Sequence, residues 1–157
     1  MLAVYTGHLR NTEDLDIIWG MPNRRSMADP LWLSRGQSLE LRGYNMKVLP
    51  AEELIWGKMY VMQRERCDWL DVMNLFYHAE AGLDWEHLIW RVQDDAPVLS
   101  SALMLFSWLC PERADEFPAW LWDRLGMGRR DLPCGSRSHL LDTRPWFVGN
   151  FPLWPDK

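Results

Sequence analysis

The sequence predicts an α+β fold, in which a small mixed or antiparallel sheet from about residues 1–50 packs against a bundle of about five helices from about residues 50–126. Short runs rich in β-branched and aromatic residues, separated by turn residues, occupy the first part of the chain. From Pro50 onward, apolar residues recur at spacings of three and four, which is the helical period. The fold class therefore follows from a change of period near residue 50.

Strands are expected over residues 2–5, 15–21, 38–42 and 45–49, the last two forming a hairpin around Gly43-Tyr44-Asn45. Between the second and third strands, Asp29 suits the N-cap of a short helix, because its side chain can accept a hydrogen bond from the first turn. Pro30 then takes the first helical position, and Gly36 ends this helix.

Two helices joined by a short charged turn are expected between Pro50 and Gly82. The first begins at Pro50 and carries Glu52 and Glu53 in its first turn, where negative charge meets the positive end of the helix dipole. The second opens at Asp68 and ends at Gly82. Their apolar faces consist of Leu54, Ile55, Met59 and Met62 in the first helix and of Trp69, Val72, Met73 and Phe76 in the second.

Three further helices are expected before the composition changes near residue 129. Asp84 caps the first, Asp95 caps the second, and Pro118 begins the third, which Gly126 ends. The middle helix has the most continuous apolar stripe in the chain, so we expect it to be the central core helix. Its stripe consists of Val98, Leu99, Ala102, Leu103, Phe106 and Leu109.

The pattern divides the chain into one domain over residues 1–128 and an extended tail over residues 129–157. The tail has four prolines, two glycines and no periodic pattern. Its isolated aromatic residues are Trp146, Phe147, Phe151 and Trp154. They predict either a segment pinned by its aromatic side chains or an arm that binds a partner protein.

Composition narrows the classes of partner. The formal charge of −5 argues against a nonspecific nucleic-acid partner, because phosphates need a basic face. Fourteen of the 17 basic residues are arginines, so local recognition of an anion stays open. The three cysteines are widely spaced, which indicates a reducing cytoplasm, and the four histidines lack the spacing of a zinc site. No apolar run reaches the roughly 18 residues of a spanning helix, so no membrane partner is expected.

Lys58 lies on or beside the apolar stripe of its helix, where a lysine either extends to solvent or meets an acid. Asp68 and Asp71 are the expected acids, and this structural ion pair would fix how the two helices cross. The alternative is a phosphate-binding site formed by Lys58, Arg64 and Arg66, since arginine favours bidentate contacts with phosphate. A solvated charged turn is the simpler interpretation of the two arginines.

Four segments of the chain resemble a known family. They read PAEELIWGKMYVMQRERCDWLDV, LDWEHLIWRV, VLSSALMLFSWLCPE and LDIIWGMPN. Together they cover roughly residues 12–125 and resemble small bacterial nucleotidyltransferase-like proteins, in the part that follows the catalytic sheet. In that family a helix with a central lysine leads to an arginine-rich turn and an Asp-x-x-Asp pair. The resemblance therefore implies a truncated nucleotidyltransferase-like core.

The resemblance also implies where the metal-binding acids of an active enzyme would lie. Asp14 and Asp16 have the Asp-x-Asp spacing of the pair that holds divalent metal for nucleotidyl transfer. The Gly-Ser turn that precedes this pair in the family has no counterpart here. A structural strand aspartate is the alternative interpretation of Asp16.

Three hypotheses of function remain open at this point. The first is a catalytically inactive nucleotidyltransferase-like protein that needs no cofactor and binds another protein, in a setting such as defence, counter-defence or a toxin–antitoxin system. The second is a Mg²⁺-dependent nucleotidyltransferase that uses Asp14 and Asp16 or is completed by a second chain. The third is a nucleotide or phosphate sensor built on Lys58, Arg64 and Arg66. Homo-oligomerisation is compatible with all three.

Overall fold

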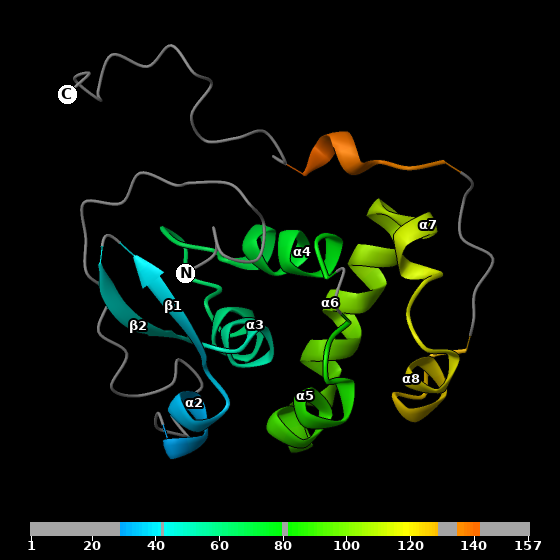
Figure 1. The fold of residues 1–157 in the computed structure, drawn as a ribbon. Coiled ribbons are helices and arrows are strands. Elements are labelled where there is room, and N and C mark those ends of the chain that lie inside the picture. Colours follow the sequence, from blue (N-terminus) through cyan, green and yellow to red (C-terminus); the bar gives the residue numbers. More distant parts are fainter. Residues whose placement is uncertain (1–28, 42, 80–81, 129–134, 142–157) are drawn as a thin grey trace, which may run out of the picture.

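The computed structural model describes residues 29–41, 43–79, 82–128 and 135–141, and they confirm the α+β fold class. The elements in chain order are α2 (Pro30–Ser34), β1 (Gln37–Leu41), β2 (Tyr44–Val48), α3 (Ala51–Met59), α4 (Trp69–Tyr77), α5 (Trp85–Val92), the 3-10 turn η1 (Gln93–Asp95), α6 (Ala96–Leu109), α7 (Pro111–Ala114), α8 (Ala119–Arg124) and the 3-10 turn η2 (Ser138–Leu140) (Figure 1). The short helix α7 was not predicted, because four residues are too few to show a helical period.

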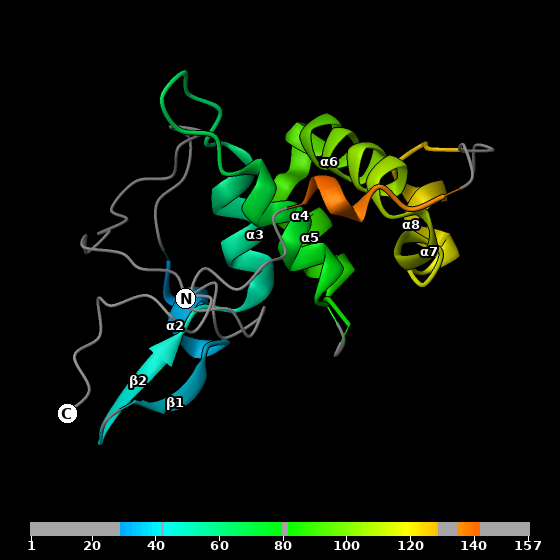
Figure 2. The same cartoon turned by 90° about the horizontal axis from the view of Figure 1, so that it is seen from above.

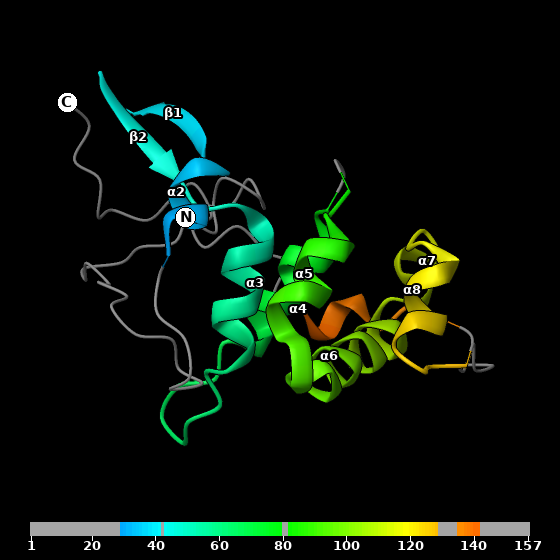
Figure 3. The same cartoon turned by 90° about the horizontal axis from the view of Figure 1, so that it is seen from below.

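These elements form three groups along the molecule. The hairpin and α2 lie at one end, helices α3 to α6 form the middle, and α7 and α8 lie at the other end (Figures 1 and 2). Figure 3, the view from below, shows the same order. Helix α6 packs against α3, α4, α5 and α7, so the prediction of a central core helix is confirmed.

Strands β1 and β2 form a two-stranded antiparallel sheet, in which Leu41 pairs with Tyr44. The predicted turn around Gly43-Tyr44-Asn45 is wrong in its position, because Tyr44 and Asn45 belong to β2. Residues 42 and 43 alone separate the strands, and Gly43 has a positive φ of 81°, which a glycine adopts without steric cost. The strands expected over residues 2–5 and 15–21 lie outside the described residues.

Side-chain caps account for two of the three helix starts at which an aspartate was predicted to cap. Asp29 Oδ1 accepts a hydrogen bond from the backbone N of Leu31 at 2.9 Å, and Asp84 Oδ1 accepts one from His87 N at 3.0 Å. The third aspartate, Asp95, occupies the N-cap of α6 without a side-chain cap bond, and its Oδ2 accepts a hydrogen bond from Tyr60 Oη at 2.9 Å. Pro50 occupies the N-cap of α3 and not its first helical position. Its φ of −55° suits either position, because the ring fixes that angle.

Two boundaries differ from the expected ones. Helix α4 ends at Tyr77 and not at Gly82. Met62 was expected on the buried stripe of α3, yet it lies outside that helix and is 54% exposed. The backbone leaves the helix after Met59 and forms an antiparallel bridge between Met62 and Cys67. This bridge closes the loop between α3 and α4 and turns the Met62 side chain away from the core.

The core contains an aromatic cluster around Phe76 on α4. Its ring centroid lies 5.7 Å from that of Trp85, 5.5 Å from that of Phe106 and 6.1 Å from that of Phe117. Phe76 and Phe106 are fully buried. Edge-to-face and tilted ring pairs at such separations add to the free energy gained by burying apolar area. One cluster therefore joins α4, α5, α6 and the segment before α8.

We predict that Phe76→Ala lowers the free energy of unfolding by about 3–5 kcal/mol, because it deletes a fully buried ring and leaves a cavity. Urea denaturation followed by circular dichroism measures this change. Trp120→Ala is the matched control, since Trp120 is 41% exposed and its loss should change the free energy by no more than about 0.5 kcal/mol. Equal losses in the two variants would contradict the central place of Phe76.

Candidate functional site

Lys58 on α3 faces the start of α4. Its Nζ donates hydrogen bonds to Asp68 Oδ2 at 3.0 Å and to Asp71 Oδ2 at 2.6 Å. The side chains of Lys58, Asp68 and Asp71 are 15%, 8% and 11% exposed, so these ion pairs lie largely out of solvent. The structure thus brings together the lysine and the two acids that we expected to fix the crossing of α3 and α4.

Arg66 extends this cluster. Its Nε and Nη2 each donate to the Asp68 carboxylate at 3.0 Å, which makes a bidentate pair. Burial acts to raise the pKa of Asp68, and the hydrogen bonds from Arg66 and Lys58 more than offset that effect, so the pKa lies below its ordinary value of 3.8. Asp68 is therefore a charged group in the folded protein, held between two cations.

Arg64 and Arg66 both lie on the exposed loop between α3 and α4. A backbone hydrogen bond from Gln63 N to Arg66 O at 2.8 Å shapes this loop. Arg66 binds Asp68, whereas Arg64 forms no ion pair with the described part of the chain. For Arg64 the geometry is that of a solvated charged turn.

Several predicted site residues lie outside the described residues, and the predictions about them stay predictions. They are Asp14 and Asp16 of the metal-site hypothesis and the tail aromatics Trp146, Phe147, Phe151 and Trp154. Within the described ranges, no group of three His, Cys, Asp or Glu side chains is placed to hold a metal ion. No helix among the described elements has the length and apolar character that crossing a membrane requires.

A second charged cluster, which the sequence analysis missed, surrounds Glu53 on α3. Glu53 lies in the first turn of α3, as predicted, and its side chain is fully buried. Its Oε1 accepts a hydrogen bond from Arg91 Nε at 2.9 Å and lies 2.6 Å from His87 Nε2. The His87 and Arg91 side chains are 9% and 5% exposed. The Glu53, His87 and Arg91 side chains are therefore largely closed to solvent.

Arg91 joins three helices within this cluster. Besides Glu53 on α3, it binds the Asp29 carboxylate at the N-cap of α2, with Nη1 and Nη2 at 2.5 and 3.0 Å. Its guanidinium carbon lies 4.7 Å from the ring centroid of Trp56 and 4.9 Å from that of Trp90. Burial acts to lower the pKa of Arg91, and the hydrogen bonds to Asp29 and Glu53 more than offset it. The Arg91 hydrogen bond in turn lowers the pKa of Asp29.

One signal in the sequence pointed to this cluster. Arg91 follows Trp85 and Leu88 at helical spacing, which places it beside the buried face of α5. A cation on an apolar face requires a buried acid, because an unpaired buried charge is costly. Glu53 precedes Trp56 and Met59 on α3 at spacings of three, which places its carboxylate on a buried face where it can pair with such a cation. The missing information was which helix would lie against α5.

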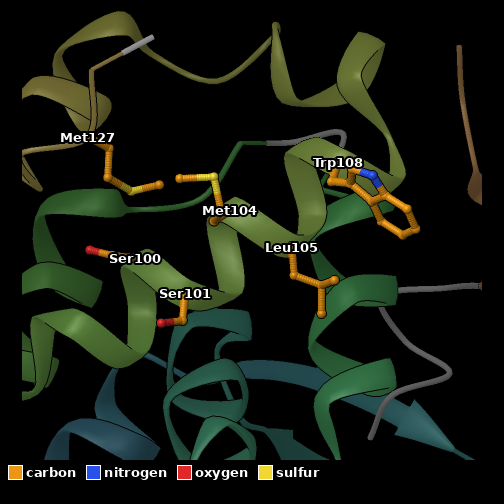
Figure 4. A pocket seen from close by; sticks show the side chains of 6 residues that line it. All are labelled: Ser100, Ser101, Met104, Leu105, Trp108 and Met127. Atoms are coloured by element: carbon orange, nitrogen blue, oxygen red, sulfur yellow. The ribbon is translucent and has the colours of Figure 1, made fainter. Parts of the chain in front are cut away.

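An open groove of about 590 Å³ lies on the exposed side of α6. It is lined by Ser100, Ser101, Met104, Leu105, Trp108 and Met127. Figure 4 shows Met104 and Met127 pointing toward each other, with Leu105 and Trp108 further along the helix. The 14-residue helix α6 contains no charged residue, yet Leu105 and Trp108 are 37% and 38% exposed. An uncharged helix is usually buried on every side, so this face has the composition of an interface core.

We predict that Glu53→Ala lowers the free energy of unfolding by about 3–5 kcal/mol, because Arg91 loses a partner inside the protein. Chemical denaturation measures the loss. The double variant Glu53→Ala/Arg91→Met should cost less than the sum of the two single variants, since it leaves no unpaired charge. Additive losses would show that the two side chains are not coupled. Glu86→Ala, at an exposed position of α5, is the matched control.

The pKa of Asp68 predicts a pH dependence. Because its folded pKa is lowered, the unfolded chain takes up the proton first as the pH falls. The stabilisation is therefore present above about pH 4 and is lost as the pH falls through the folded pKa. We expect the difference in unfolding free energy between the wild type and Asp68→Asn to shrink from pH 6 to acid pH. A constant difference would contradict this, and Asp123→Asn at an exposed site controls for net charge.

No family model matches the sequence, and neither a curated protein nor a solved structure matches it. The function is therefore inferred from the contacts and the exposed surfaces of the described residues.

Proposed function

We propose that this protein is a protein-binding module and that the groove on α6 is its docking surface. The observation that carries the proposal is an uncharged helix with one face in the core and the other exposed. Burying the exposed face against another protein would remove apolar area from water, at about 25 cal/mol per Å². A single partner segment that packs along α6 would bury the exposed face of this helix, so that both of its faces would be out of solvent.

The residues around the groove are those that protein interfaces prefer. Trp108 provides a large ring with a polar edge, which is typical of interface hot spots. Met104 and Met127 are unbranched and adapt their shape to a bound side chain. Ser101 is small and lets a partner approach the helix backbone closely, while its Oγ already donates to Pro97 O at 2.8 Å. The groove therefore favours apolar and aromatic side chains over charged ones.

The other two hypotheses have less support from the described residues. A phosphate sensor built on these three residues would need several free cations, whereas Lys58 is held by Asp68 and Asp71 and Arg66 by Asp68, which leaves Arg64 as the one of the three without an ion pair among the described residues. The nucleotidyltransferase-like ancestry and the loss of catalysis stay predictions from the sequence, because Asp14 and Asp16 lie outside the described residues. The biological setting also stays a prediction.

We predict that Leu105→Arg abolishes the capture of a specific partner, because it places a charge in the middle of an uncharged surface. The measurement is affinity capture from the lysate of the source organism, with the recovered proteins quantified by mass spectrometry. The purified partner is then titrated against the wild type and the variant. A desolvated charge of this kind should weaken binding by at least tenfold.

Met46→Arg is the matched control for this experiment. Met46 is also exposed and apolar, at 51%, but it lies on the hairpin at the opposite side of α3 from α6 (Figure 1). A protein that binds the wild type and Met46→Arg, but not Leu105→Arg, supports the docking surface. If every captured protein binds Leu105→Arg as well as the wild type, the groove is not where partners bind.

A further inference from the structure

The segment 135–141 leads the chain to one end of the α6 groove. Arg137 donates from its backbone N to Leu109 O at 2.6 Å and from Nη1 to Trp108 O at 3.0 Å. Its guanidinium carbon also lies 4.8 Å from the ring centroid of Trp108. Leu141, at the end of this segment, is 3% exposed and belongs to the core. These contacts fix the start of the C-terminal tail beside a residue that lines the groove.

The tail that follows matches the groove in chemistry. Residues 145–155 read PWFVGNFPLWP, and none of them is charged. The groove and the helix that carries it are also uncharged. Aromatic side chains bury more area than any others, and the exposed ring of Trp108 offers them a stacking partner. Arg137 is the charged group at the end of the groove, and its guanidinium already lies on the Trp108 ring and donates to Trp108 O.

The chain is also long enough. Trp146 follows Leu141 by five residues, and five extended residues span at most about 17 Å. From Trp108 to Ser101 the groove follows seven residues of α6, which is about 10.5 Å. The first aromatic pair of the tail, Trp146 and Phe147, is therefore joined by a short tether to a segment that already contacts Trp108.

We propose that the α6 groove is a receptor for an aromatic segment and that Trp146 and Phe147 of the same chain occupy it. This inference rests on the proposed function, because it takes the groove to be a docking surface. A tethered segment acts at an effective concentration in the millimolar range. An external partner must therefore displace the tail from the groove. Weak apolar ligands cannot do so, whereas a partner with a similar aromatic segment can compete for the same lining residues.

Hydroxyl-radical footprinting of the full chain tests the proposal. The rates of oxidation of Met104 and Trp108 are measured by mass spectrometry in the wild type and in Trp146→Ser/Phe147→Ser. We expect both groove residues to react several-fold faster in the variant, because the occupant is lost. Met46 and Met62, which are 51% and 54% exposed away from the groove, are internal controls and should react at unchanged rates.

A second variant identifies the occupant. Phe151→Ser/Trp154→Ser removes the distal aromatic pair and should leave the rates at Met104 and Trp108 as in the wild type. Equal rates in all three chains would overturn the proposal, and so would faster oxidation caused by the distal pair alone. The binding experiment with Leu105→Arg is independent of both results. It would still detect a groove that binds a partner protein but not the tail.

Discussion

The absence of charge from α6 is the constraint on which the rest of the structure depends. This helix packs against α3, α4, α5 and α7, and its buried residues Leu103 and Phe106 are fully enclosed. Helices α4 and α5 pack against both α6 and α3, so α6 forms one side of the core and α3 another. The same lack of charge continues onto the exposed side, where Leu105 and Trp108 remain in contact with solvent. Helix α6 therefore has one face in the core and another exposed to solvent.

Two clusters of charge fix the elements that surround this core. Lys58 holds the start of α4 against α3, and Arg91 holds α2 and α3 against α5. A buried ion pair adds little net stability, since its Coulomb energy is offset by desolvation. A buried ion pair instead favours one arrangement of the helices, because an arrangement that separates the pair leaves a buried charge without its partner. We interpret both clusters as determinants of how the helices are arranged.

Charged and uncharged side chains occupy different regions of the described part of the protein. The charged side chains of the Lys58 and Arg91 clusters are engaged with one another. The exposed face of α6 consists of uncharged side chains, and Arg137 lies on the Trp108 ring at one end of it. A partner bound at this face, as we propose, would be recognised by its shape and apolar area, and its affinity should depend weakly on salt. The anchored segment near Arg137 contacts Trp108 at one end of that face.

The sequence by itself determined the fold class, the caps at Asp29 and Asp84, and the central place of α6, because these depend on local hydrogen bonds and on the period of apolar residues. It also pointed to the acids around Lys58, since they lie close to it in the chain. Only the tertiary structure decided that Glu53 is buried against Arg91, 38 residues away. It alone also showed that one side of α6 is open, because the period of a helix reveals its apolar residues but not which of them a neighbour covers.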